Sequence, residues 1–221
     1  MKKQSVISMI MLLVALSPLG YLLVIYYSIP ATFVSRFEFD TTFEEVQSRD
    51  SLLIASGILS LVSVLIYFLM RNLKKIDPKV QESTPTSSFN RIGLIITLFL
   101  VITNYLLIFT AKDGWLINTS TALIYFGLFV ILIGNYMNNI RPNYVAGIRL
   151  PWTLKDPNNW RKTHQLAGKM WVAGGVLLIG GGFILPKSFL SPFTIALLII
   201  ITVIPGIYSY KMHRNNIKSA V

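Results

Sequence analysis

Residues 92–111 read IGLIITLFLVITNYLLIFTA, a run that contains no charged side chain. A helix of about 20 apolar residues is long enough to cross the roughly 30 Å hydrocarbon layer of a membrane. Five further runs share this character, so that six candidate spans cover residues 5–27, 51–70, 92–111, 121–137, 170–185 and 190–208. The sequence therefore predicts an all-α integral membrane protein with six transmembrane helices.

The composition of the chain agrees with this prediction. Of its 221 residues, 53% are hydrophobic and 13% are charged, whereas roughly 25% are charged in a typical soluble domain. No segment between the spans is long enough to fold separately, so we expect residues 1–221 to form a single membrane domain. The first run follows Lys2 and Lys3, as a signal peptide would, but it is longer than a signal core and no clear A-x-A site follows it. We expect it to be retained as a span.

Basic residues are distributed unevenly between the two sides that six spans would create. With the N-terminus inside, 16 Lys and Arg residues fall on the inner side and 4 on the outer side. The positive-inside rule then predicts that both termini are cytoplasmic. It places residues 28–50 outside, and residues 71–91 and 138–169 in the cytoplasm. This bias accounts for the net charge of +11, and we expect no nucleic-acid partner because no soluble basic domain is present.

The inner segment at 77–90, DPKVQESTPTSSFN, is rich in Ser, Thr and Pro and is typical of a flexible polar linker. The spans themselves contain no Asp, Glu, Lys or Arg. Transporters coupled to ions usually place such groups near the membrane midplane, so their absence argues against an active transporter. The polar residues expected to be buried within the spans are Asn104 and Asn135, which could join helices by hydrogen bonds.

Small residues recur in the fifth span at intervals of seven. Ala167, Gly174 and Gly181 form one such series, and a second follows one position later. Seven residues are close to two helical turns, which predicts a stripe where another helix approaches closely. The glycines assigned to this packing face are Gly174, Gly175, Gly181 and Gly182. A comparable serine stripe on the second span contains Ser56, Ser60 and Ser63.

The segment 138–169 carries the clearest local signals outside the spans. Asp156 followed by Pro157 is typical of a helix start, because the carboxylate accepts from the first turn and proline needs no donor there. Trp160, His164 and Ala167 then recur at helical spacing, which predicts a helix that continues into the fifth span. Gly147 and Pro151 favour a shaped turn before it. We expect a compact interfacial loop between the fourth and fifth transmembrane helices.

This loop also holds the candidate binding residues, which are Asn143, Arg149, Trp152, Trp160, Thr163 and His164. Arg149 offers a planar donor fork to a carboxylate, phosphate or carbonyl group. The two indoles offer apolar walls, each with an N–H donor. Tryptophan and basic residues are also ordinary interfacial anchors, so this simpler interpretation stays open.

Catalysis and metal binding are not indicated. The loop has one acid, Asp156, and one histidine, with no carboxylate pair and no Ser-His-Asp set. A metal site usually needs three or four ligands, and the other histidine, His213, lies far along the chain. Cysteine is absent. We expect no enzyme activity, no metal and no cofactor.

The order PN-xxx-GIR-x-PWTL followed by NW-xx-TH, within residues 142–164, resembles the signature of the bacterial SdpI family. Ile29, Pro30, Phe33 and Asp40 also faintly resemble an external IP-x-HF…G…D element of that family, with Thr32 in place of the histidine and no glycine before Asp40. We interpret this external element as degenerate.

The resemblance implies a multi-pass protein of the bacterial cell membrane that gives immunity to a secreted cannibalism toxin. Its implied partners are membrane lipids, a peptide toxin and, if the protein also signals, a cytosolic regulator held at the membrane. Two alternatives remain open at this point. One is a membrane-embedded enzyme or lipid-handling protein that uses the same loop on a headgroup, and the other is an uncoupled channel or exporter.

Overall fold

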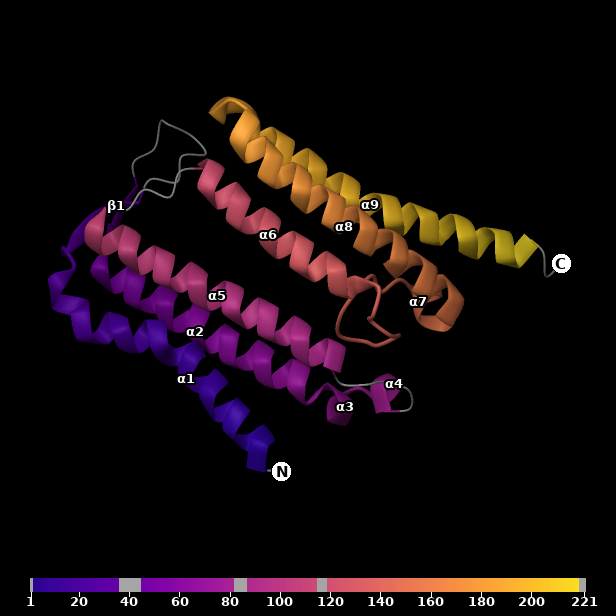
Figure 1. Cartoon of the computed structure of the whole chain (residues 1–221), viewed down its shortest axis with the longest axis horizontal. Helices are drawn as coiled ribbons and strands as arrows, with labels where there is room; N and C mark the ends of the chain where they lie inside the picture. Colours follow the sequence, from indigo (N-terminus) through magenta and orange to yellow (C-terminus); the bar gives the residue numbers. More distant parts are fainter. Residues whose placement is uncertain (1, 36–44, 82–86, 115–118, 219–221) are drawn as a thin grey trace. The chain divides into compact units, whose positions relative to one another are not determined.

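The computed structural model describes residues 2–35, 45–81, 87–114 and 119–218. Its long helices are α1 (Lys2–Ile25), α2 (Arg49–Arg71), α5 (Ser87–Asp113), α6 (Thr119–Met137), α8 (Pro157–Ile184) and α9 (Lys187–Lys218) (Figure 1). Six segments, one in each of these helices, are long and apolar enough to cross a membrane, which confirms the six predicted spans. The helices α8 and α9 extend well beyond the apolar runs predicted at 170–185 and 190–208. Polar residues form the first part of α8 and the last part of α9.

Short elements connect these helices. A single 3-10 turn, η1 (Tyr26–Ser28), precedes the antiparallel strands β1 (Thr32–Ser35) and β2 (Glu45–Ser48), in which Thr32 pairs with Ser48. The helix α3 (Leu73–Ile76), with Leu73 buried, precedes the segment predicted to be a flexible linker. That segment contains α4 (Pro78–Gln81), in which Val80 is buried, and the first residues of α5. Residues 82–86 of that segment, and Asp40 of the external element, lie outside the described residues.

The chain divides into two compact units, and unit 1 comprises residues 1–71 and 93–119. Its core contains Leu22, Leu52 and Ile108, contributed by α1, α2 and α5. Asn104 is buried and donates through Nδ2 to the carbonyl oxygen of Ser56 and to Oγ of Ser60, both at 3.1 Å. This pair of bonds joins α5 to α2, the role expected for Asn104.

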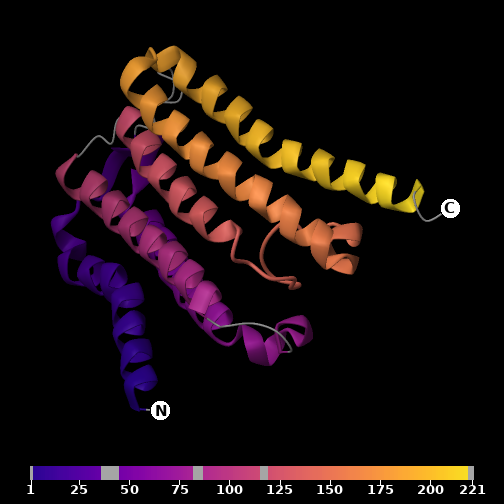
Figure 2. The ribbon, with the colours of Figure 1, turned by 45° about the vertical axis from the view of Figure 1, so that its right-hand side comes forward.

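Unit 2 comprises residues 72–92 and 120–221 and is built mainly from α6, α8 and α9. The helix α8 lies between α6 and α9, and both views show the three running alongside one another (Figures 1 and 2). Its core includes Leu123 and Val130 of α6, Leu178 of α8, and Leu197 and Ile201 of α9. The short helix α7 (Pro151–Lys155) contacts both α8 and α9.

The glycines of α8 face two different neighbours. A methyl group added at Gly175 would lie 2.6 Å from the carbonyl oxygen of Gly127, and one at Gly182 would lie 3.0 Å from that of Ser120, both on α6. One added at Gly174 would instead lie 2.9 Å from the Ile201 side chain of α9. Successive helical residues are rotated by about 100°. The two seven-residue series therefore form two packing faces, where the sequence had indicated one stripe.

Asn135 differs from the prediction, because its side chain is exposed and not buried. The adjacent Gly134 is the residue that turns toward α8, where a methyl group would lie 2.7 Å from Cβ of Trp171. Because successive helical residues are rotated by about 100°, Asn135 points away from the contact that Gly134 makes with α8.

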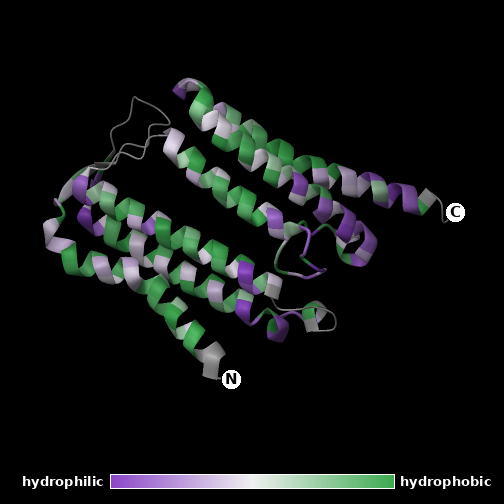
Figure 3. Cartoon of the chain, viewed as in Figure 1, coloured by the Kyte–Doolittle hydropathy of each residue, from purple (hydrophilic) through white to green (hydrophobic). Residues whose placement is uncertain are grey.

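Hydrophilic residues gather at one end of unit 2. Figure 3 shows them along the beginning of α8 near α7 and along the last part of α9, whereas the middle of each helix is predominantly hydrophobic. The loop that joins α6 to α8 lies at this same end, so the fold places the signature residues beside the polar end of the helix layer.

Candidate functional site

The loop ends where the sequence predicts that a helix begins. The carboxylate of Asp156 accepts from the backbone N–H of Asn158 at 2.8 Å, and Pro157 occupies the first turn of α8. This geometry confirms the predicted helix start. Trp160, His164 and Ala167 are all buried on one face of α8, so this face supports the loop.

Gly147 and His164 form the central contact of the loop. Gly147 has a φ of +104°, in the left-handed region, and a Cβ there would collide with Nε2 of His164. The next residue, Ile148, donates its backbone N–H to Nε2 at 2.9 Å. Because the Trp160 carbonyl, 2.8 Å from Nδ1, can only accept, this geometry assigns the imidazole proton to Nδ1 and makes the ring neutral.

Trp160 packs beneath this contact. Its ring is 1% exposed and stacks on His164, with centroids 4.1 Å apart and planes inclined by 19°. Its Nε1 donates to the carbonyl oxygen of Ile140 at 2.7 Å. The indole therefore joins the start of the loop to α8 and lies inside the protein rather than at its surface.

Asn143 organises the turn that follows α6. Its Oδ1 accepts the backbone N–H groups of Val145 and Ala146 at 2.8 and 2.6 Å, and its Nδ2 donates to the carbonyl oxygens of Arg141 and Ala146 at 2.8 and 3.0 Å. The amide thus makes four bonds to the main chain and is fully buried. Replacing it would leave several buried backbone groups without a partner.

A buried polar network connects α7, α8 and α9. Ser209 of α9 accepts from Nε1 of Trp152 at 3.0 Å and donates to Oδ1 of Asn159 at 2.6 Å. Thr163 donates to the same Oδ1 at 3.0 Å, and Nδ2 of Asn159 donates to the Ser209 carbonyl at 3.0 Å. The Trp152 ring also stacks on His213, with centroids 5.5 Å apart.

Three members of this architecture were not predicted from the sequence. Asn159 and Ser209 lie 50 residues apart, so no local pattern links them. Asp77 is buried and accepts the backbone N–H of Tyr144 at 2.6 Å, which ties the loop to the segment between α3 and α4. Its position before Pro78 was a possible signal, since an acid before proline often ends or begins a local turn.

Arg149 differs from the other candidate residues because its side chain is exposed. One of its nitrogens, Nη1, donates to the carbonyl oxygen of Tyr144. Within the described part of the chain, its other donors make no hydrogen bond. The structure therefore separates the six candidates into four that are buried (Asn143, Trp160, Thr163 and His164), a half-buried Trp152, and an exposed Arg149.

No group of three or more His, Asp or Glu side chains in the described residues could hold a metal ion. The arrangement instead consists of buried amides, hydroxyls and indoles that fix the loop backbone, with a guanidinium at its surface. Such a site is suited to recognising an acceptor group by hydrogen bonds.

The loop, α7 and much of α8 and α9 correspond to a known family. The model of the SdpI/YfhL protein family matches residues 139–209, about a third of the chain. Residues 139–209 belong to the SdpI/YfhL family. This confirms the resemblance read from the signature residues. With its six apolar helices, the protein is a multi-pass protein of the bacterial cell membrane.

A relative supports the same assignment. Over 88 residues the chain is 31% identical to immunity protein SdpI of Bacillus subtilis (strain 168). The aligned stretch covers 40% of this chain and 42% of the relative, so less than half of either protein is matched. No solved structure matches the chain.

Proposed function

We propose that this protein is an SdpI-like immunity protein that protects its cell from a membrane-active peptide toxin. The match to the SdpI/YfhL family supports this role, because the matched region contains all the signature residues at 142–164. The similarity to an immunity protein over the aligned stretch supports it as well.

The observation that carries the proposal is the contrast between Arg149 and the residues around it. The side chains of Asn143 and His164 accept hydrogen bonds from backbone N–H groups of the loop. The Thr153 hydroxyl likewise accepts from the backbone N–H of Leu150 at 2.9 Å. Arg149 is exposed, with one bond that holds its guanidinium in place. A pre-organised loop loses little conformational entropy on binding. Arg149 would therefore contact an acceptor on the toxin or on a partner protein.

We further propose that the loop faces the cytoplasm. The uneven distribution of Lys and Arg over the two sides of the six spans supports this orientation. A partner bound by the loop would then be a cytosolic regulator or a part of the toxin that reaches the inner membrane surface.

Deleting the gene provides the direct test of this function. Cells without the protein should stop growing in medium from a culture of the parent strain, and restoring the gene should restore growth. Equal growth of deleted and parent cells would contradict the immunity role. Turnover of phospholipid by the purified protein would favour the alternative of a membrane-embedded enzyme.

A further inference from the structure

A groove lies between α6 and α8, and none of the six candidate binding residues lines it. It has a volume of about 630 Å³ and is lined by Asn135 of α6, by Asn138 just after the end of α6, and by Gln165 and Lys169 of α8. Gly134 and Gly168 form its floor, and a methyl group at Gly168 would lie 2.9 Å from the carbonyl oxygen of Gly134. The two glycines thus let the helices approach and leave the groove open above them.

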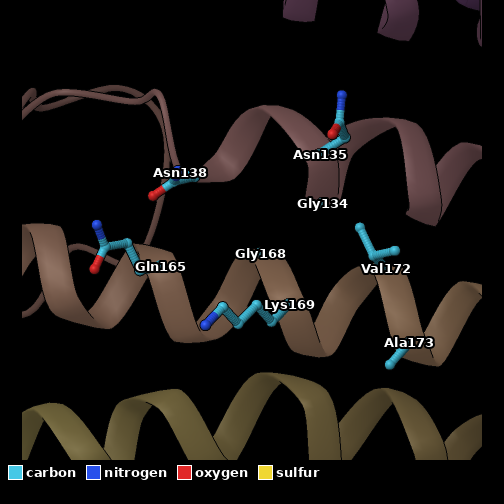
Figure 4. A pocket seen from close by; sticks show the side chains of 8 residues that line it. All are labelled: Gly134, Asn135, Asn138, Gln165, Gly168, Lys169, Val172 and Ala173. Atoms are coloured by element: carbon cyan, nitrogen blue, oxygen red, sulfur yellow. The ribbon is translucent and has the colours of Figure 1, made fainter.

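The polar side chains of the groove have unused hydrogen-bonding capacity. In the described part of the chain, the side chains of Asn135, Asn138, Gln165 and Lys169 are exposed and make no hydrogen bond. Figure 4 shows Lys169 extending along α8 toward Gln165, with Asn138 at that end of the groove. Amide and ammonium donors therefore gather at one end.

The charged residues that line this region are all basic. Asn138 also borders a second cavity of about 510 Å³, whose wall contains Arg141 and Arg161. Arg161, Gln165 and Lys169 are spaced by four residues and so follow one face of α8. None of the described residues lining either cavity is Asp or Glu. The site is complementary to an anion.

The same face becomes apolar farther along the two helices. On α8, Lys169 is followed by Val172 in the groove wall and then by Val176, which is 56% exposed. At 1.5 Å per residue, Val176 lies about 10 Å beyond Lys169. On α6, Asn135 is preceded on its own face by Leu128, which is 51% exposed. The surface is therefore polar and cationic at one end and apolar along the strip that follows. It is complementary to a molecule with a phosphate group followed by acyl chains.

We propose that this groove binds one anionic phospholipid, with its phosphate against Lys169, Gln165 and Asn138 and its acyl chains along Val172 and Val176. The proposed topology would place the groove in the inner leaflet, where anionic lipids attract basic residues. The site is independent of Arg149 and of the immunity proposal, since none of its residues belongs to the signature contacts described above.

Native mass spectrometry of the full-length protein in detergent tests this site. Phosphatidylglycerol and phosphatidylcholine with identical acyl chains should be added in parallel. We expect one phosphatidylglycerol molecule to be retained in preference to phosphatidylcholine. Lys169→Gln should weaken its binding about fivefold, the contribution of one basic residue near an anionic surface. Lys211→Gln, which removes an exposed lysine from the polar end of α9, should leave the binding unchanged.

Three results would overturn the proposal. Equal retention of the two lipids, or equal effects of the two lysine variants, would mean that the groove does not recognise the anionic headgroup. Displacement of phosphatidylglycerol by millimolar glycerol phosphate would assign the site to a small soluble phosphate. We expect no such displacement, because the soluble compound lacks the chains that would contact Val172 and Val176.

Discussion

The imidazole of His164, in α8, occupies the space that a side chain at Gly147, in the preceding loop, would need. The contact allows Ile148 to donate its backbone N–H to the ring at 2.9 Å. Two requirements therefore meet at residue 147, a left-handed backbone and the absence of a Cβ.

Replacing Gly147 by alanine should therefore destabilise the loop. We expect a cost of about 1–2 kcal/mol from the left-handed conformation alone, with an added cost from the clash with His164. The melting temperature of the purified protein in detergent should fall clearly. Gly114→Ala is the matched control, because Gly114 also has a positive φ, of +66°, but nothing lies within 4 Å of an added Cβ. An equal fall for both variants would show that the contact with His164 contributes nothing.

The buried network around Ser209 gives a second prediction. Ser209→Ala should remove the acceptor of Trp152 and a donor to Asn159. A buried polar group left without a partner costs about 1–3 kcal/mol, so the melting temperature should fall. Ser191→Ala, in the same helix, removes a hydroxyl that makes no hydrogen bond within the described residues and should have little effect. Similar melting of the two variants would contradict the importance of the network.

The two packing faces of α8 should respond differently to substitution. Gly175→Ala would place a methyl group 2.6 Å from a backbone oxygen of α6, which cannot move without shifting the helix. Overpacking of this kind costs about 1–3 kcal/mol. Gly180→Ala, with open space around it, should be neutral or stabilising by up to about 1 kcal/mol. Folded yield and melting in detergent measure both. Loss of stability in the Gly180 variant alone would contradict the assignment of Gly175 to the packing face against α6.

Much of the fold could be predicted because its signals are local. A run such as 92–111 needs only its own hydropathy to be recognised as a span, and the pair Asp156 and Pro157 marks the start of α8 by itself. The strands at Thr32–Ser35 and Glu45–Ser48 were not predicted, because four residues are too few for a periodic pattern.

The site could be predicted in its residue types but not in its orientation. The signature identified His164 and Trp160, yet their burial depends on a contact with Gly147 and a bond to Ile140 across the loop. The link between Trp152 and Ser209 spans 57 residues. Such pairings arise from the packing of α7, α8 and α9 together and leave no trace in local sequence spacing.

The orientation in the membrane can be tested with introduced cysteines, since the chain has none of its own. Val46 and Asn158 are exposed positions in the segments proposed to be outside and inside. Val46→Cys should react with an impermeant thiol reagent in intact cells, whereas Asn158→Cys should react only after the membrane is opened. Reaction at position 158 in intact cells would reverse the proposed topology.

The survival of cells carrying Arg149→Lys tests the central claim most directly. Lysine keeps the positive charge but cannot reproduce the planar donor fork. Loss of a charge-assisted hydrogen bond, worth about 1.5–3 kcal/mol, should lower the protective effect by about tenfold or more. Arg214→Lys, at an exposed position of α9, serves as the control and should protect like the parent. We predict that, at equal membrane levels, cells with the Arg149 variant die in medium from the parent culture while cells with the Arg214 variant grow. Equal survival of both would show that Arg149 is a simple anchor and would contradict the proposed role of the loop.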